Sequence, residues 1–304
     1  MKIFLTGSTG LVGGEILDYL ISKKINVVCG NRKSNSIVSS PYVKNIPFDL
    51  NDCNLDKKII NEIKGCNGII HCGAQIPTAE VSFSDSGLFF KTNSLGTETL
   101  LKYAIKSKIK KFIYISTISV LESEPRPIKE ENNFNLSNSY ASSKVFGEMF
   151  CNYYAREENL QVTTLRISAP YGNNRHQRGV IYTFLDRIQN SKDIELWSQG
   201  KRQQVFTHTK DIARACLLSL ESSYRGTLNI TGPDSISMFD LANLIIEETQ
   251  SKSSRIILSD KIDPQANQQK SVSLVKSFDK INYEPKYNLP TGLRQVLKNL
   301  KRIN

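Results

Sequence analysis

Tyr140 and Lys144 are four positions apart, a spacing that places two side chains on one face of a helix. A cation beside a phenol favours the phenolate, so we expect Lys144 to lower the pKa of Tyr140 from its usual value of about 10. A tyrosine tuned in this way serves as a general acid or base near neutral pH. Upstream, an apolar stretch ends in Ser116 and Thr117, whose hydroxyl groups we expect beside the same site.

A glycine-rich turn follows the first apolar stretch, with glycines at positions 7, 10 and 13. Gly7 permits a tight turn, Gly10 lets a pyrophosphate approach the backbone, and Gly13 lets a helix pack close to a sheet. Because the next residues open a helix, its N-terminal amide groups and its dipole favour phosphate there. We therefore predict a dinucleotide site, which also includes Thr9, Leu11 and Val12.

The end of the second expected strand carries Asn31, Arg32 and Lys33, with no acidic residue among them. An acid at this position usually holds the ribose 2′-hydroxyl of NAD and would repel a 2′-phosphate. Arg32 is suited to bind that phosphate. We therefore expect NADP(H) as the cofactor. The alternative is that Arg32 and Lys33 are solvated and that the protein uses NAD(H) without an acidic contact.

The hydrophobic pattern supplies a scaffold that brings these residues together. Amphipathic stretches expected to be helices alternate with apolar runs expected to be strands buried on both faces. This alternation predicts an α/β fold, a doubly wound parallel sheet of the Rossmann type. The expected strands are 2–5, 26–29, 68–71, 112–115 and 160–167, and the helices between them include 12–22 and 95–106.

The pattern changes after Pro170, where a polar stretch at 173–179 is predicted to be a loop. We expect residues 1–172 to form the Rossmann domain and residues 173–304 to form mainly a smaller α/β lobe that binds substrate. Strands near 204–211 and 227–231 are expected to return to the first domain. The remaining expected elements are helix 180–190, strand 194–197, helix 237–249 capped by Ser237, and helix 291–302.

The bulk composition excludes several classes of protein. The six cysteines are scattered without a Cys-x-x-Cys pair and the three histidines are far apart, so we expect neither a disulfide framework nor a metal site. The net charge is +11, and residues 251–304 hold eleven Lys/Arg against four Asp/Glu. This charge suits an anionic small molecule, whereas no aromatic interleaving suggests nucleic acid. No apolar run is long enough to cross a membrane, so we expect a cytoplasmic protein.

The chain resembles the extended short-chain dehydrogenases/reductases, and among them the NAD-dependent epimerase/dehydratase group, along nearly its whole length. Beyond the glycine turn and the Tyr-x-x-x-Lys pair, matching segments occur at 49–50, 71–74, 93–97, 116–120, 165–172, 206–211 and 226–230. The resemblance implies further cofactor contacts from Asp49, Leu50, Cys72, Gly73, Ala74, Asn93, Ser116, Ile167 and Pro170.

The resemblance also implies roles at the reacting carbon. Tyr140 passes a proton to or from the substrate oxygen, Lys144 bonds the nicotinamide ribose, and Thr117 holds the reacting oxygen. Two positions depart from the family pattern: Ala169 replaces a frequent asparagine, and Gln204 replaces a frequent arginine that grips a diphosphate. Either Arg202 substitutes for that arginine, or the substrate lacks the diphosphate. The implied substrate contacts are Gln75, Thr117, Ala169, Arg202 and Gln204.

Our leading hypothesis is NADPH-dependent reduction of a keto-sugar, a nucleotide-linked 4-keto-6-deoxy sugar, with Tyr140 as proton donor. The alternative is an NAD-dependent nucleotide-sugar 4-epimerase or a dehydratase. The dehydratase ranks lower because the acidic pair that commonly follows the catalytic hydroxyl is missing after Thr117. Reduction of a non-sugar carbonyl and a non-catalytic NADP(H)-binding protein are further alternatives. The resemblance finally implies a homodimer formed through the helices at 93–107 and 140–156.

Overall fold

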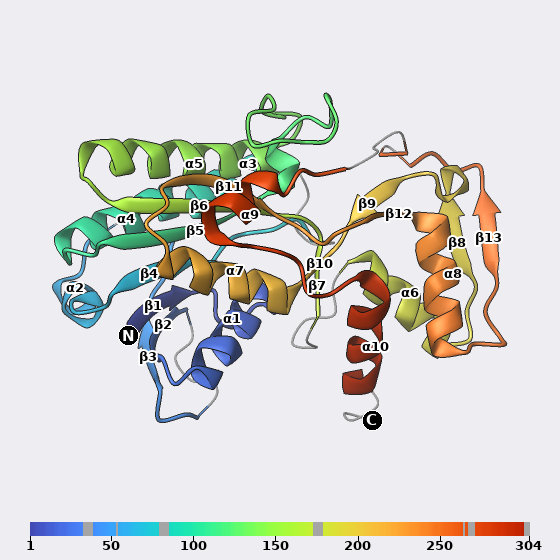
Figure 1. The fold of residues 1–304 in the computed structure, drawn as a ribbon, viewed down its shortest axis with the longest axis horizontal. Coiled ribbons are helices and arrows are strands. Elements are labelled where there is room, and N and C mark those ends of the chain that lie inside the picture. Colours follow the sequence, from blue (N-terminus) through green and yellow to red (C-terminus); the bar gives the residue numbers. More distant parts are fainter. Residues whose placement is uncertain are drawn as a thin grey trace.

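Seven parallel strands form one central sheet. In this computed structural model the described residues are 1–32, 39–52, 54–78, 85–172, 179–263, 265–266 and 271–300. The strands are β1 (Lys2–Thr6), β2 (Asn26–Asn31), β3 (Val43–Pro47), β4 (Gly68–His71), β5 (Lys111–Thr117), β6 (Gln161–Ile167) and β11 (Gly226–Ile230). Their order is β11-β6-β5-β4-β1-β2-β3, and every pairing is parallel (Figure 1). The predicted doubly wound α/β fold is confirmed.

Successive residues of the inner strands point to opposite faces of the sheet, and both faces are buried. In β1, Ile3 and Leu5 join one hydrophobic cluster while Phe4 joins another. In β5, Ile113 joins the first cluster and Phe112 the second. This burial on both sides explains why these strands appear in the sequence as unbroken apolar runs.

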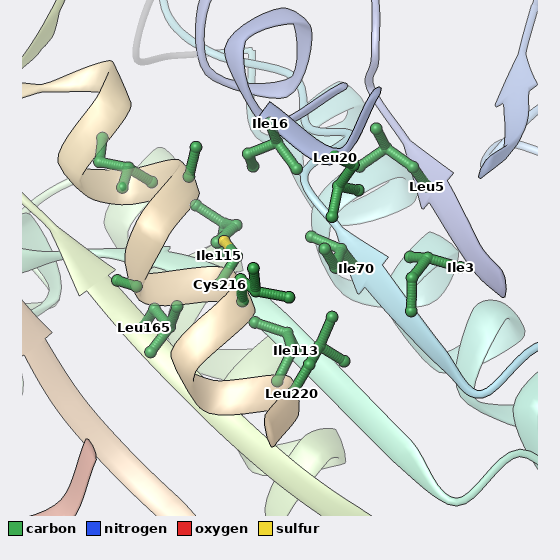
Figure 2. Packing of buried hydrophobic residues seen from close by; sticks show 14 of the residues in the cluster. Ile3, Leu5, Ile16, Leu20, Ile70, Ile113, Ile115, Leu165, Cys216 and Leu220 are labelled. Carbon is green, nitrogen blue, oxygen red and sulfur yellow. The ribbon is translucent and has the colours of Figure 1, made fainter. Parts of the chain in front are cut away.

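Helices cover both faces of the sheet. On one face Ile16, Leu20, Cys216 and Leu220 project from two helices onto the strand side chains, including Ile113 (Figure 2). The helices on this face are α1 (Leu11–Ser22) and α7 (Thr209–Glu221), and those on the opposite face are α2 (Lys57–Ile63), α4 (Gly96–Lys106) and α5 (Ser139–Glu157).

A smaller C-terminal lobe packs around a hydrophobic cluster of its own, separate from the two that flank the sheet. Three helices and several short strands build it, and they lie beyond the carboxyl ends of the central strands (Figure 1). The helices are α6 (Val180–Gln189), α8 (Met238–Thr249) and α10 (Leu289–Leu300). The strand pairs are β8 (Ile194–Trp197) with β13 (Ile256–Ser259), β9 (Gln203–Val205) with β12 (Ser235–Ser237), and β7 (Pro170–Tyr171) with β10 (Thr207–His208).

One strand expectation needs correction. The segment near 204–211 does not return to the central sheet as one strand, because it divides at Phe206 into β9 and β10, which pair in two different small sheets. Residues 209–211 then begin α7, whose first turn is capped by the His208 side chain. The strand expected at 227–231 does join the central sheet, as β11 beside β6.

Other local expectations hold. Ser237 caps α8, since its hydroxyl accepts a hydrogen bond from the Asp240 amide. Among the described residues, no helix combines the length and the apolar character that crossing a bilayer requires. The remaining elements are α3 (Ser86–Phe89), the π-helical turn η1 (Phe90–Leu95), the 3-10 turns η2 (Ile118–Val120) and η3 (Ser198–Gly200), and α9 (Val275–Ile281).

Candidate active site

A cavity of about 860 Å³ opens at the carboxyl ends of the central strands, between the sheet and the C-terminal lobe. Its size lies in the range of small-molecule and cofactor sites, roughly 300–1,000 Å³. The carboxyl edge is also where ligands bind in open α/β sheets. The predicted site residues that line it are Gly7, Thr9, Gly10, Leu11, Val12, Gly13, Asn31, Arg32, Asp49, Leu50, Cys72, Gly73, Ala74, Gln75, Ser116, Thr117, Tyr140, Lys144, Ile167, Ala169, Pro170, Arg202 and Gln204.

The glycine turn forms one end of the cavity. Gly7 has φ +73°, and a Cβ there would lie 2.6 Å from the Gly73 amide nitrogen, so the turn requires glycine. A Cβ on Gly13 would overlap the Gly7 carbonyl group. Gly10 differs, because a Cβ there would meet only the Gly7 oxygen, at 3.4 Å. The protein itself has room for a side chain at Gly10, so the glycine leaves that space to the cavity.

The start of α1 adds anion-binding groups to this turn. Gly10 is the N-cap residue of α1, and a glycine has no side chain with which to cap the helix. The first amide groups of a helix have no partner within the helix, and the helix dipole adds positive potential there. The turn is therefore built to hold a phosphate group, and its geometry fits a dinucleotide.

The end of β2 presents donors to the cavity. Asn31 is buried, and its side-chain oxygen accepts a hydrogen bond from the Ser8 hydroxyl at 3.0 Å. Its amide nitrogen is buried and has no hydrogen-bond partner among the described residues. Arg32 is exposed and lines the same part of the cavity. Lys33 lies outside the described residues. Within the part of the chain that the structure describes, the Asn31 amide is thus an unpaired donor near the position where a dinucleotide ribose is expected.

The candidate reaction centre lies where β5 meets α5. α5 begins with Asn138 as its cap, whose side chain accepts a hydrogen bond from the Ala141 amide at 2.8 Å. This places Tyr140 in the first turn and Lys144 one turn later, both lining the cavity beside Thr117 at the end of β5. The Thr117 hydroxyl accepts a hydrogen bond from the Ser119 amide at 3.2 Å.

The expected lowering of the Tyr140 pKa is not present. Desolvation in the cavity wall raises the pKa of Tyr140 to about 12, and it lowers the pKa of Lys144 to about 8. The ammonium of Lys144 donates instead to the Ile115 carbonyl oxygen at 2.7 Å and lies 4.1 Å from the centroid of the Tyr114 ring. Helical spacing correctly placed the two residues on one face, but the sequence did not reveal their removal from water.

Asn93 does not line the cavity, although we expected it to contact the cofactor. It is buried in η1, where its side-chain oxygen accepts from the Gln75 amide at 2.8 Å and its nitrogen donates to the Gln75 carbonyl oxygen at 2.9 Å. The same nitrogen donates to the Ser143 hydroxyl at 3.0 Å. Asn93 therefore holds the backbone of Gln75, which does line the cavity.

His71 precedes the cavity segment Cys72–Ala74 and supports it from behind. It is buried between two threonine hydroxyls, with Thr6 at 2.8 Å and Thr97 at 3.0 Å. Burial lowers the pKa of His71 to about 3, so the ring is neutral at physiological pH. The Thr6 hydroxyl in turn accepts from the Gly73 amide at 3.1 Å, which fixes the turn after β4.

The far end of the cavity is supplied by the C-terminal lobe, with Ala169, Gln204 and Arg202 among its lining residues. Arg202 donates to the Gln265 side chain at 3.2 Å and pairs with Asp263 at 3.4 Å. Several lining residues were not predicted from the sequence motifs. Ser119 could have been found two positions after Thr117, whereas Gln265 lies on a distant loop with no local signal. Other missed residues are Phe48, Asn51, Thr92, Tyr171, Tyr182 and Phe206.

Comparisons with known proteins agree with this fold. The NAD dependent epimerase/dehydratase family matches residues 3–231. A putative UDP-glucose 4-epimerase of Methanocaldococcus jannaschii is 27% identical, and the match covers 99% of each chain. The solved UDP-glucose 4-epimerase of Thermotoga maritima with UDP-glucose has a TM-score of 0.88 at 23% identity, covering 100% of this chain and 99% of the other.

A second solved structure has the same fold. The dTDP-glucose 4,6-dehydratase of Streptomyces venezuelae, with NAD bound, has a TM-score of 0.86 at 21% identity and covers 99% of this chain and 97% of the other. The fold and site thus define an enzyme of the extended short-chain dehydrogenase/reductase type. The chain belongs to the NAD-dependent epimerase/dehydratase family.

Proposed function

We propose that this chain is a nucleotide-sugar 4-epimerase that retains NAD. The make-up of the reaction centre carries the proposal: Asp49 is the one carboxylate among the described lining residues, and it follows β3, away from Thr117 and Tyr140. Epimerisation removes and returns hydride at one carbon and needs one proton carrier, whereas 4,6-dehydration needs a further acid–base group for the elimination. The relatives named as UDP-glucose 4-epimerases support the same choice.

The cavity fits a nicotinamide dinucleotide. The bare backbone at Gly10 and the start of α1 would hold the pyrophosphate, and the Asn31 amide would bond the adenosine ribose. Asp49 and Leu50 would contact the adenine, and Lys144 the nicotinamide ribose. Bound in its oxidised form, the cofactor would supply a hydride acceptor and a positive charge in the same cavity.

Tyr140 is the proton carrier in this proposal. It takes the proton of the sugar hydroxyl as that carbon is oxidised, and it returns the proton when the carbon is reduced from the opposite face. Thr117 donates a hydrogen bond that holds the reacting oxygen. Lys144 anchors α5 to the end of β5 through the Ile115 carbonyl oxygen. The positive charge of the oxidised cofactor would lower the free energy of the phenolate. Arg202 binds a phosphate of the substrate at the lobe end.

A second candidate is the NADPH-dependent keto-sugar reductase. Arg32 favours it, because an exposed guanidinium at the end of β2 is suited to a ribose 2′-phosphate. Relatives solved with NAD weigh toward the epimerase. The two functions differ in how the cofactor is held, since an epimerase regenerates its NAD within one site and a reductase must exchange NADP(H).

Cofactor release from the purified protein tests the choice. We expect denaturation to liberate close to one NAD per chain, and the undenatured protein to interconvert UDP- or dTDP-hexoses that differ at C4 without added cofactor. Arg32→Asp should leave NAD retention unchanged. Protein that purifies empty, prefers NADPH and loses that preference in Arg32→Asp would instead establish the reductase.

We further propose a homodimer through α4 and α5. Large apolar side chains stand exposed along this face, including Leu95, Phe146, Met149 and Tyr153. Phe146 packs edge-on against Phe90 of the neighbouring turn, at 5.4 Å between ring centroids. An exposed patch of this kind marks an interface. Light scattering at micromolar concentration should give the mass of a dimer, and Met149→Glu should give that of a monomer.

A further inference from the structure

A buried ion pair lies directly behind the reaction centre. Glu148 and Arg166 are both almost fully buried, and their carboxylate and guanidinium meet at 2.7 Å. The guanidinium Nε also donates to both carboxylate oxygens, at 3.0 and 3.2 Å. Neither residue lines the cavity. Replacing a buried ion pair by apolar side chains is often neutral or stabilising, so stability alone does not account for this pair.

The ion pair contacts the end of β5, the strand that carries Thr117. Glu148 accepts a hydrogen bond from the Ser116 hydroxyl at 2.5 Å. Lys144, one helical turn earlier on α5, donates to the carbonyl oxygen of Ile115. Helix α5 therefore holds two successive residues of β5, immediately before Thr117.

Arg166 extends these contacts across the sheet. It stands opposite Ser116 in the β5–β6 register and opposite Asn229 in the β6–β11 register. The remaining guanidinium nitrogen of Arg166, Nη1, donates to the Glu130 carbonyl oxygen at 2.8 Å, and the Glu130 carboxylate accepts from the backbone amide of Asn229 at 2.8 Å. One row of polar groups thus ties β5, β6 and β11 together at the level of the reaction centre.

The carboxylate of Glu148 also acts on Lys144. The two residues are four positions apart on α5 and both are buried, so the anion offsets part of the cost of burying the ammonium. Desolvation lowers the pKa of Lys144 to about 8, and Cys72 and then Glu148 oppose that shift. The titratable groups that face Lys144 from the surrounding elements are His71, Cys72, Tyr114, Tyr140, Glu148 and Cys151.

We propose that Glu148 and Arg166 are positioning residues for the reaction: the pair fixes the end of β5 against α5, and Glu148 holds Lys144 as an ammonium ion. Tyr140, Lys144 and Glu148 then lie on one face of α5, in three successive turns. The proton carrier comes first, the ammonium second and its counter-ion last. The kinetic tests of this inference rest on the proposed function. The pH dependence of unfolding does not depend on it.

Glu148→Gln tests the proposal on the purified protein, with Glu157→Gln at the exposed end of α5 as the matched control. We expect kcat to fall at least about tenfold while the KM for the sugar nucleotide stays within about twofold, because the pair does not line the cavity. The alkaline limb of kcat should move at least about one pH unit lower, since Lys144 loses its proton more readily. Glu148→Asp should restore the position of that limb.

Glu148→Gln leaves Arg166 buried without its counter-ion and could lose activity because it unfolds. A double variant separates this effect from the loss of positioning. Glu148→Met with Arg166→Met removes both charges at similar volume, and we expect it to fold and to show the same loss of kcat and the same shifted limb. A folded double variant with the kcat and alkaline limb of the original protein overturns the proposal.

Unfolding provides the readout that does not depend on turnover. The free Lys144 pKa is 10.5 and its folded value about 8, so the unfolded chain binds the extra proton and stability rises with pH between these values. In Glu148→Gln the free energy of unfolding should begin to rise below pH 8. Urea unfolding at successive pH values measures this onset. An unchanged onset overturns the proposal. If the original protein turned over no sugar nucleotide, only the epimerase proposal would be refuted. The pH dependence of unfolding would still decide the role of Glu148.

Discussion

The ammonium of Lys144 donates a hydrogen bond to the Ile115 carbonyl oxygen at 2.7 Å, two residues before Thr117. The cation therefore anchors α5 to the strand, while Tyr140 stands one helical turn away. Desolvation then decides the protonation of Tyr140, and the phenol is the prevailing form at neutral pH because its pKa is about 12. A charge brought into the cavity by substrate or cofactor has to favour the phenolate before proton transfer begins.

Tyr140→Phe tests Tyr140 as the proposed proton carrier. The variant should fold and retain cofactor, since the ring keeps its packing against Phe89 at 5.9 Å between centroids. Turnover should fall by roughly 10²–10⁴, the usual contribution of a positioned general acid or base. Turnover, thermal midpoint and bound cofactor would be compared with those of Tyr153→Phe, on the exposed side of α5. Undiminished turnover would remove Tyr140 from the chemistry.

Alanine substitutions at two glycines of the turn should have different effects, one on stability and one on cofactor binding. Gly13→Ala forces a methyl group into the Gly7 carbonyl, so we expect a loss of about 1–3 kcal/mol in the free energy of unfolding. Gly10→Ala has room within the protein and should unfold like the original, yet purify without cofactor because the methyl group occupies the space left for pyrophosphate. Urea unfolding and cofactor content measure both. A Gly10→Ala variant with full cofactor content would contradict this view of the turn.

His71 should make the fold sensitive to acid. Its pKa is about 3 when folded against 6.5 when free, so below pH 6.5 the unfolded chain binds a proton that the native state refuses. Its contribution to stability is complete above pH 6.5 and is lost as the pH falls toward 3, on the order of 5 kcal/mol in all. His71→Gln cannot titrate, so its unfolding free energy should fall less steeply over this window. Equal slopes would show that His71 is not the cause.

Arg202 should matter for substrate but not for cofactor. Arg202→Met removes a cation that Gln265 and Asp263 hold at the lobe end, and we expect the KM for a sugar nucleotide to rise roughly ten- to hundredfold with cofactor content unchanged. Lys201→Met, at the exposed neighbouring position, is the matched control. Inhibition by free UDP or dTDP should weaken in parallel. If both variants keep the original KM, the phosphate is bound elsewhere.

Features set by local pattern were predictable from the sequence. The glycine turn needs only its own spacing, the inner strands only their apolar runs, and Tyr140 with Lys144 only the helical period. Ser237 likewise caps α8 through a contact three residues away. In each case the physical cause lies within a few residues, which is why a single chain reveals it.

Features set by distant contacts were not predictable. Gln265 reaches the cavity from a loop about sixty residues after Arg202, and nothing near it in the sequence marks that role. Asn93 was assigned to the cofactor because its segment resembles a family motif, but its amide is used in holding Gln75. The pKa of Tyr140 depends on desolvation, which spacing does not report.

The pairing of β11 with β6 has a consequence for how the chain is made. β6 ends at Ile167, but its outer neighbour β11 begins only at Gly226, so the α6 region, β8–β10 and α7 emerge from the ribosome between them. During that interval six strands are available and the rim of β6 presents unpaired backbone groups, a template for association with another nascent chain. Synthesis speed through residues 168–225 should therefore influence the yield of soluble protein, and slow translation there would favour aggregation.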